Sequence, residues 1–239
     1  MSYLNTTKGK IKFKQHLLYP GCHVINKDTA FENLKIIHKV LSNKNIFWEV
    51  SWGTLIGIVR DNDFIDWDED VDIVILEEEE EDFKTALWEL QDCGFELIRY
   101  ERGGLYSISK NGEYTDFYVL RKASSEIRYT LDGGFFLEKH LVESSIIDFK
   151  GLSLRIPKDY DDFLTFYYGD WQTPVQYYFT DLSLLKRIKM IGNYFCRIYL
   201  PDCVYYRIIR KRRSSDINAF IDKVKTKGIV LEEEPQILI

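Results

Sequence analysis

The chain has 239 residues, of which 45% are hydrophobic and 29% are charged, and its formal net charge is −6. This length suits one good-sized domain with a real core, but two independent enzymes would not fit comfortably. The negative charge argues against a protein that coats nucleic acid, because neutralising phosphates requires clustered Lys and Arg side chains. We therefore expect a folded globular protein with no nucleic-acid partner.

The first residues, the apolar stretches and the cysteines of the sequence indicate the cellular compartment. The first twenty residues contain lysines but no apolar run after them, and no stretch of about eighteen uncharged apolar residues occurs anywhere. The cysteines form no Cys-x-x-Cys pair, which argues against a zinc knuckle or a redox motif. We expect no signal peptide, no membrane span and a cytoplasmic protein with reduced thiols.

The first predicted elements lie between residues 28 and 60. Apolar residues recur at helical spacing over residues 28–41, which predicts an amphipathic helix capped by Asp28 or Thr29. Residues 46–52 are β-branched and aromatic and predict a strand, which Gly53 ends. Residues 54–60 then form a short helix, so this stretch predicts a strand, a glycine turn and a helix in sequence.

A second strand and a helix follow. Residues 71–76 are almost entirely apolar and predict a buried strand, with carboxylates at its entrance. The acidic run from Glu77 to Asp82 is interpreted only as the first turn of a helix that reaches Gly94, because acidic side chains favour the positive end of a helix dipole. This gives another strand-to-helix unit.

Strands and turns dominate the next part of the chain. Asn111-Gly112 predicts a hairpin turn within residues 95–122, and Asp116 is then in the middle of a strand. Lys150-Gly151 predicts a second hairpin. Residues 159–168 predict a helix that ends at Gly169.

From residue 181 onward the pattern is mainly helical, with breaks expected at Pro201 and at Ser214-Ser215. The pattern as a whole predicts an α/β (α+β) fold, a mixed sheet flanked by helices with a helical C-terminal extension. We divide the chain into an N-terminal extension (1–27), a catalytic domain (28–180) and a helical C-terminal region (181–239).

The residues that indicate chemistry are Asp70 and Asp72. Alternate residues of a strand face the same side, so these two carboxylates project together, with Cα atoms about 6.6 Å apart. Carboxylate ligands without Cys or His favour Mg²⁺ or Mn²⁺ and disfavour zinc. Asp116 is the best third ligand, because a carboxylate in an otherwise apolar strand needs a partner. An isolated Asp-x-Asp is more often a solvated loop, but the apolar strand that follows argues against that here.

Several further residues suit a phosphate-containing substrate. The backbone after Gly53 and the hydroxyl of Thr54 can bind a phosphate beside the metal site. Arg60 either neutralises donor phosphates or forms a salt bridge with Asp61 or Asp63. Trp171 either stacks on the donor base or packs against a helix end.

The same segment carries a family resemblance. Gly53-Thr-Leu-Ile-Gly57 to Arg60, followed by Trp67-Asp-Glu-Asp70-Val-Asp72, resembles the LicD family, which includes fukutin-like proteins. A second stretch, Ile156 to Leu164 with Tyr168 to Pro174, is similar to the closing motif of that family. The resemblance covers about residues 28–174, and the chain departs from it at Asp63, where glycine is usual, and at Asp66, where proline is usual.

The resemblance implies a nucleotidyltransferase-like fold, related to that of polymerase beta. It implies transfer of phosphocholine or a similar phospho-group, such as phosphoribitol, from a CDP-linked donor to a hydroxyl of a glycan or glycolipid. Asp70 and Asp72 match the metal-binding pair, Asp116 matches a later strand aspartate, and Gly53 with Thr54 match the phosphate-contacting turn. Asp116 or another carboxylate would accept the hydroxyl proton, and His140 is a weaker candidate.

Two other functions remain possible from the sequence, and segment 186–213 has two interpretations. Nucleotide-sugar glycosyltransferases also use an Asp-x-Asp metal site, but the residues before Asp70 are few for their nucleotide-binding unit. The same fold without catalysis would be a binding module. The basic, aromatic segment 186–213 is either a helical hairpin with its aromatic residues packed on the domain, which we favour, or a peripheral contact with an anionic membrane. The sequence predicts no oligomeric state.

Overall fold

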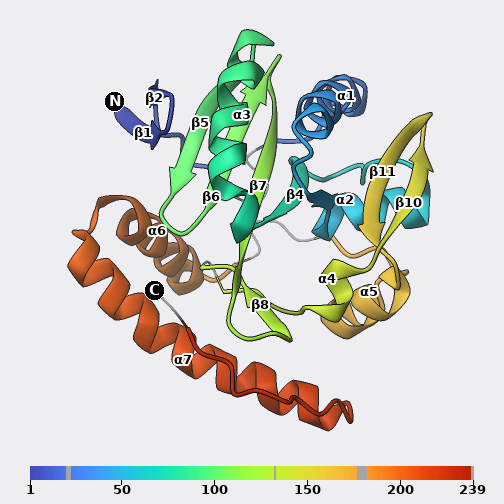
Figure 1. Ribbon diagram of the computed structural model, residues 1–239, viewed down its shortest axis with the longest axis vertical. Helices are drawn as coiled ribbons and strands as arrows, with labels where there is room; N and C mark the ends of the chain where they lie inside the picture. The colour runs from blue at the N-terminus through green and yellow to red at the C-terminus, as the bar shows by residue number, and fades with distance from the viewer. Residues whose placement is uncertain (20–22, 132, 177–181, 238–239) are drawn as a thin grey trace.

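The computed structural model describes residues 1–19, 23–131, 133–176 and 182–237. Its centre is a mixed sheet whose strands lie in the order β3-β4-β7-β6-β5, with β8 and β9 continuing from β7 (Figure 1). Strands β4 and β7 are parallel, and every other pair in the sheet is antiparallel. The bounds are β3 Trp48–Val50, β4 Val71–Leu76, β5 Glu96–Glu101, β6 Leu105–Lys110, β7 Glu113–Lys122, β8 Ile127–Tyr129 and β9 Phe135–Leu137. The predicted α/β class with a mixed sheet is confirmed.

Helices α1 (Lys27–Asn43) and α3 (Glu80–Asp92) contact each other beside this sheet (Figure 1). The predicted apolar positions of α1 are buried, which confirms its amphipathic pattern. The predicted cap was wrong. Asn26 caps the helix, its side chain accepting a hydrogen bond from the Thr29 N–H at 3.0 Å, because the helix begins one residue earlier than its apolar spacing indicates.

The predicted strand and short helix around Gly53 are present, but the predicted glycine turn between them was wrong: the helix already begins at Trp52, so Gly53 lies in its first turn. After β3, helix α2 (Trp52–Ile56) continues directly into a π-helical turn (Gly57–Asp61) and ends where Asn62 adopts a left-handed conformation. Trp52 also has a positive φ of 46°, a conformation that bulky residues rarely adopt outside functional sites.

The acidic run before α3 does more than the sequence indicated. Glu77–Glu79 form a single 3₁₀ turn before the α-helix begins. Glu78 accepts hydrogen bonds from Arg128 at 2.8 and 3.0 Å, and Glu80 pairs with Arg121 at 2.9 Å. These acidic residues therefore fasten the start of α3 to the end of β7 and to β8, in addition to suiting the helix dipole.

Both predicted hairpins are confirmed. Asn111 and Gly112 join β6 to β7 with φ values of 55° and 88°, and a turn with two positive φ values matches the twist of the strands that it joins. The second hairpin pairs β10 with β11. The remaining elements of this part are α4 Lys139–Val142, β10 Ser144–Phe149, β11 Leu152–Pro157 and α5 Tyr160–Tyr168, which ends at Gly169 as expected.

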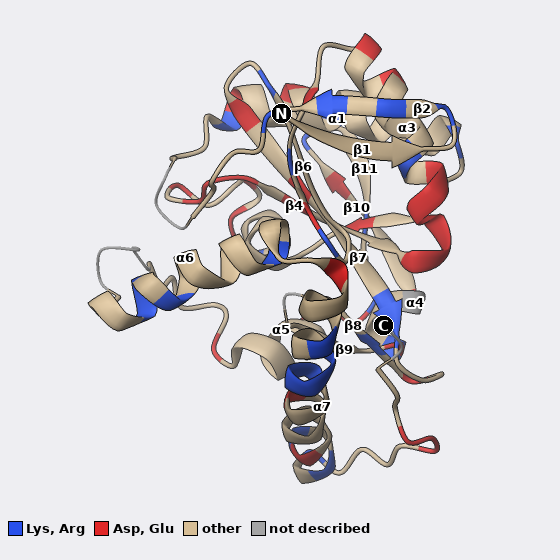
Figure 2. Cartoon of the chain, turned by 90° about the vertical axis from the view of Figure 1, so that its left-hand side faces the viewer, with Lys and Arg blue, Asp and Glu red and all other residues tan. Residues whose placement is uncertain are grey.

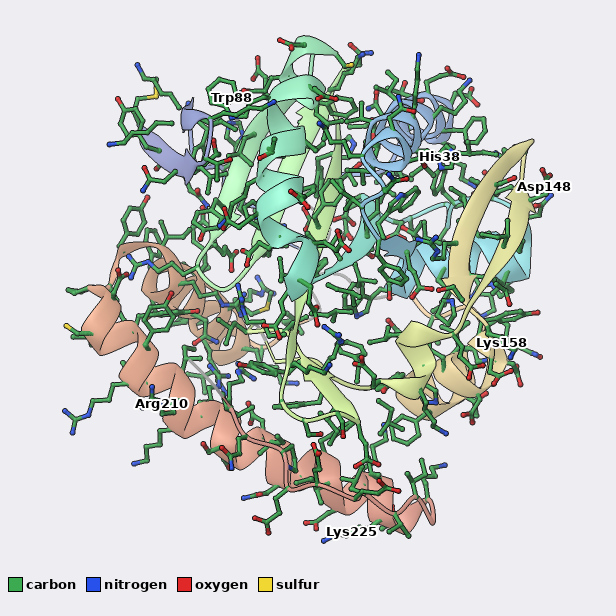
Figure 3. All side chains as sticks on the ribbon, in the orientation of Figure 1. His38, Trp88, Asp148, Lys158, Arg210 and Lys225 are labelled. Atoms are coloured by element: carbon green, nitrogen blue, oxygen red, sulfur yellow. The ribbon has the colours of Figure 1, made fainter. Side chains whose placement is uncertain are left out.

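The first residues form a small hairpin, β1 (Ser2–Thr6) and β2 (Gly9–Phe13), which packs on the domain. Leu4, Ile11 and Phe13 belong to the main hydrophobic core. Trp88 of α3 lies next to the hairpin and donates a hydrogen bond from its indole nitrogen to Thr6 Oγ1 at 2.9 Å (Figure 3).

Two helices form the C-terminal region, α6 (Leu184–Tyr199) and α7 (Asp202–Thr226), and both lie below the sheet in Figure 1. The break at Pro201 is present. The break predicted at Ser214-Ser215 was wrong: α7 continues through it, and the Ser214 hydroxyl donates to the Arg210 carbonyl one turn earlier. Within the described ranges, no helix combines the length and apolar character needed to cross a membrane.

Helix α7 shares a second hydrophobic core with β8 and β9. Its buried side chains lie on one face at helical spacing and pack against aromatic residues of these strands, as in the stacked pair of Phe135 and Phe220. The buried apolar residues of α7 are Tyr205, Ile209, Ile217, Phe220 and Val224.

Candidate active site

A row of polar side chains crosses the sheet on one face. Asp72 on β4 is in register with Asp116 on β7, Asp116 is opposite Ser107 on β6, and Ser107 is opposite Arg99 on β5. Residues paired in register present their side chains on the same face. Arg99 donates from Nε to Ser107 Oγ at 2.8 Å and pairs through Nη2 with the Asp116 carboxylate.

Asp72, Asp116 and Arg99 of this row line a cavity of about 400 Å³, here called the acid cavity. Asp70 joins the row at the entrance to β4, so the structure brings all three predicted carboxylates to one place. The lining residues are Leu18, Tyr19, Trp52, Gly53, Asp68, Glu69, Asp70, Asp72, Arg99, Tyr114, Asp116 and Tyr118.

The electrostatics of the acid cavity reflect an excess of negative charge. Burial raises the pKa of Asp70 well above its ordinary value, and the nearby Asp72 and Asp116 raise it further. Burial likewise raises the pKa of Asp72, with Asp68 and Asp116 adding to the effect. Burial raises the pKa of Asp68 to about 6. Arg99 is the only Lys or Arg that lines this cavity within the described part of the chain.

Two observations test whether a divalent cation fits here. Asp68, Glu69 and Asp70 each place one carboxylate oxygen within 4.8 Å of the others, the only such His, Cys, Asp or Glu group found in the described ranges. Asp116 Oδ1 is buried and has no hydrogen-bond partner among the described residues. Oxygen ligands of this kind suit Mg²⁺ or Mn²⁺. Of the predicted trio, Asp70 belongs to the tight group, whereas Asp72 and Asp116 lie deeper on the strands.

Gly53 and Thr54 join helix α2 to the carboxylates. A side chain at Gly53 would bring its Cβ to 2.5 Å from Asp68 Oδ2, so only glycine permits this close approach. The backbone N–H of Gly53 acts against the rise in the pKa of Asp72. Thr54 is fully buried, and its hydroxyl accepts a hydrogen bond from the Asp72 N–H at 2.8 Å. The first turn of α2 therefore lies at the cavity, with Thr54 holding the backbone of Asp72.

The two departures from the family motif, Asp63 and Asp66, face a lysine cluster. Lys27 of α1 pairs with Asp63 at 3.2 Å and also with Asp66, and Lys150 pairs with Asp63 at 2.5 Å. These pairs tie the loop between α2 and β4 to α1 and to the β10–β11 turn. The acidic substitutions therefore have local partners that hold the loop leading to Asp68 and Asp70.

Arg60 and Trp171, predicted to bind the donor, do not line the acid cavity. Arg60 donates to Asp61 at 2.9 and 2.7 Å and to the Trp171 carbonyl at 3.3 Å. Trp171 is buried beside Tyr160. The structure thus places both residues in the alternative roles that the sequence left open, as a salt bridge and as helix-end packing.

His140 also lies away from the acid cavity. It is 4% exposed, its Nε2 lies 3.0 Å from Asp162, and its ring packs against Phe163 and Tyr167. Burial lowers its pKa. This environment is typical of a structural histidine.

Sequence reasoning missed Arg99, Trp52 and Tyr118. Arg99 is 7% exposed and lies in a strand of apolar neighbours, which was the available signal, since a buried arginine requires acidic partners. Trp52 packs against Tyr118 at the cavity wall, with ring centroids 4.5 Å apart and the ring planes tilted by 47°. The position of Trp52 directly before Gly53 was a weaker signal.

Arg99 also links the acid cavity to the C-terminal region. Its Nη1 lies 3.8 Å from the buried Glu101, whose other oxygen accepts from Arg197 of α6 at 2.9 Å. Charges of alternating sign therefore run from Asp116 through Arg99 and Glu101 to Arg197. Removing any member leaves its neighbours with an unbalanced buried charge.

Residues 45–159 match the family model described as LicD/FKTN/FKRP, nucleotidyltransferase domain. This segment is therefore similar to the LicD family. The match contains α2, β4, β7 and Arg99 and ends before α5, so it confirms the predicted resemblance over residues 45–159.

The chain is also similar to two uncharacterized rickettsial proteins. It is 27% identical over 150 residues to one from Rickettsia prowazekii (strain Madrid E), covering 60% of this chain and 55% of that protein. It is 27% identical over 148 residues to one from Rickettsia typhi (strain ATCC VR-144 / Wilmington), covering 60% and 46%. The chain thus matches about half the length of these relatives.

Among solved structures, the lincosamide antibiotic adenylyltransferase LnuA with lincomycin bound is 12% identical, with a TM-score of 0.43 over 68% of this chain and 94% of that one. The antibiotic-resistance factor ANT(2'')-Ia in solution is 14% identical, with a TM-score of 0.45 over 82% and 97%.

Proposed function

We propose that the chain transfers a phospho-group, phosphocholine-like or phosphoribitol-like, from a CDP-activated donor to a hydroxyl of a glycan or glycolipid. The observation that carries this proposal is the acid cavity, in which buried carboxylates from β4 and β7 meet the first turn of α2 in a segment similar to the LicD family. So many acidic groups in one buried place require a cation and suit an anionic substrate bound through it.

Mg²⁺ or Mn²⁺ would be held by oxygens from Asp68, Glu69, Asp70, Asp72 and Asp116. When bound, the ion supplies positive charge that neutralises the donor phosphates and the leaving nucleotide. The fit rests on the orphaned Oδ1 of Asp116 and on the raised pKa values of Asp70 and Asp72, because each indicates a missing positive partner.

The chain's own residues position the reactants. Arg99 keeps Asp116 in place within the row, and Thr54 holds the backbone of Asp72. A carboxylate of the row accepts the proton of the attacking hydroxyl. Catalysis of this kind depends mainly on position and charge, which a row fixed by strand register provides.

Room for an acceptor lies next to the acid cavity. Trp52 lines both the acid cavity and a second cavity of about 670 Å³, whose walls include Phe136, Tyr167 and Tyr168. Flat aromatic surfaces suit the apolar faces of sugar rings. An acceptor bound against these aromatic residues could extend its hydroxyl group past Trp52 into the acid cavity.

The test is a donor panel with Mg²⁺, containing CDP-choline, CDP-ribitol and several nucleotide sugars, in which donor turnover is measured. We expect turnover of a CDP-linked donor. Asp72→Asn should reduce it about a thousandfold, since losing several kcal/mol of charge stabilisation has that effect on rate.

Asp92→Asn, an exposed carboxylate on α3, is the matched control and should retain full activity. The Asp72→Asn protein should melt no lower than the wild type, because the change relieves repulsion among buried carboxylates. Turnover of nucleotide sugars alone would assign the chain to the glycosyltransferases. Donor binding without turnover would assign it to the binding modules.

A further inference from the structure

Helix α6 carries its apolar face on the outside of the molecule. Leucine, isoleucine and aromatic residues recur at spacings of three and four along it, which places them on one side of the helix. Their side chains are between 39% and 79% exposed. This apolar stripe consists of Leu184, Leu185, Ile188, Ile191, Phe195 and Tyr199.

The polar side of α6 is the side that meets the domain. Tyr194 donates its hydroxyl proton to the His16 carbonyl at 2.8 Å, and Arg197 pairs with the buried Glu101 at 2.9 Å. Arg102 of the loop after β5 donates to the Ile198 carbonyl at 2.9 Å. No described residue of α6 is fully buried. The aromatic residues Phe195 and Tyr199 therefore do not pack on the domain as we had favoured from the sequence.

The segment that carries the apolar stripe is basic. Residues 182–215 contain nine Lys and Arg and one acidic residue, Asp202, although the whole chain has a net charge of −6. Two of the nine face the protein, since Arg197 pairs with Glu101 and the buried Arg213 pairs with Asp216. Asp202 is paired with Arg102 at 2.8 Å. Figure 2 shows α6 projecting from the body of the molecule with basic residues along it. On α7, the exposed Val204 and Ile208 add apolar surface near further basic residues.

We propose that α6 lies in the surface of an anionic lipid bilayer, with the apolar stripe inserted among the lipids and the basic residues on the headgroups. Helices that expose a wide apolar face with Lys and Arg beside it bind membrane surfaces in this way. Each basic residue near an anionic leaflet contributes attraction, which salt weakens. A second copy of the chain is a poorer occupant, because it would bring another basic segment against this one.

Bilayer binding has a consequence for the acid cavity. Arg197 of α6 connects through Glu101 and Arg99 to Asp116, so a helix anchored on lipid holds the cavity close to the headgroups. An acceptor glycan attached to a lipid would then be within reach. This consequence rests on the proposed function, whereas the lipid binding itself does not.

The experiment is flotation of the purified full chain with vesicles of phosphatidylcholine alone and of phosphatidylcholine mixed with phosphatidylglycerol. We expect recovery with the mixed vesicles, a decrease with added salt and little recovery with phosphatidylcholine alone. Ile188→Asp with Phe195→Asp should weaken binding at least about tenfold, the factor that burial of one large apolar side chain represents. Ile146→Asp, on an equally exposed apolar residue of β10, is the matched control and should bind as the wild type does.

Two charge-reversal double variants test the electrostatic contribution to vesicle binding. Lys186→Glu with Lys189→Glu should reduce recovery with the mixed vesicles, whereas Lys10→Glu with Lys12→Glu, on the exposed side of β2, should not. Equal recovery of the apolar variant and the wild type would overturn the proposal. Sedimentation that shows a dimer lost on Phe195→Asp, without vesicle binding, would also overturn it, by assigning the stripe to a second copy. Donor turnover without vesicles should be the same in all these variants, so loss of lipid binding and failure of the proposed transfer are distinguishable.

Discussion

The acid cavity and helix α6 depart in opposite directions from the usual distribution of side chains. In the acid cavity, charged groups such as Asp116 and Arg99 are almost completely buried. On α6, large apolar side chains such as Leu185 face outward. Most of the apolar side chains of the described residues instead fill two cores, as is usual.

The difference between the two regions shows what each one lacks: the acid cavity lacks positive charge, and α6 lacks an apolar partner. A buried charge is stable only when it is paired, so the acid cavity is incomplete without positive charge beyond that of Arg99. An exposed apolar stripe on a helix is stable in the isolated chain, but it gains free energy when something apolar covers it. One region therefore favours a cation and an anionic substrate, and the other favours a lipid surface.

The largest change in folding stability is expected from breaking the charge row. Arg99→Met leaves Asp116 and Glu101 buried without their common partner, and we expect the free energy of unfolding to decrease by about 3–5 kcal/mol. Urea denaturation measures this. Arg207→Met, at an exposed position of α7, should change it by less than about 0.5 kcal/mol. Equal effects of the two substitutions would contradict the view that the row is a paired, buried network.

A smaller effect concerns Glu49, a buried carboxylate of β3 that does not line the acid cavity. Burial raises its pKa to about 8, although it accepts a hydrogen bond from the Ser144 hydroxyl at 2.8 Å and lies near Arg155. Because the folded chain holds this proton more tightly than the unfolded chain, Glu49 destabilises the fold progressively as pH rises from 4.5 to 8.

The expected loss over this range is on the order of a few kcal/mol. Between these pH values, the free energy of unfolding, measured by denaturation, should decrease less for Glu49→Gln than for the wild type. The measurement distinguishes two kinds of buried carboxylate: Glu49, which burial keeps neutral, and the carboxylates of the acid cavity, which a cation would keep charged. Parallel pH profiles for the two proteins would show that Glu49 is ionised in the folded chain.

The smallest effect is expected on α6. Leu185→Ser removes a side chain that is 79% exposed, so the free energy of unfolding should change by less than about 0.5 kcal/mol. Ile209→Ser, in the second core, should lower it by about 2–5 kcal/mol. Thermal and urea melts compare the two. A large effect of Leu185→Ser would mean that the apolar stripe already packs on the protein.

Much of the acid cavity was accessible from the sequence, because local patterns determine it. Alternation along a strand places Asp70 and Asp72 on one side. The Asn111-Gly112 turn fixes the hairpin register, and that register places Ser107 opposite Asp116.

Two features of the polar row across the sheet could not be predicted from the sequence. The parallel pairing that places Asp72 beside Asp116 joins strands more than thirty residues apart, and no local signal sets its register. Arg99 enters the row only because β5 pairs with β6, with a register shift between Leu97 and Arg99. Such pairings follow from packing of the whole sheet, so the third predicted carboxylate could be proposed from the sequence but its salt bridge could not.

The C-terminal region shows the same division. Spacing along the sequence determined that residues 184–199 form a helix with one apolar and one basic, polar side. Only the tertiary structure decided which side meets the domain, because that depends on partners such as Glu101 and the His16 carbonyl, which lie far away in the chain. Local sequence sets which residues share a face, whereas long-range contacts select the face that is covered.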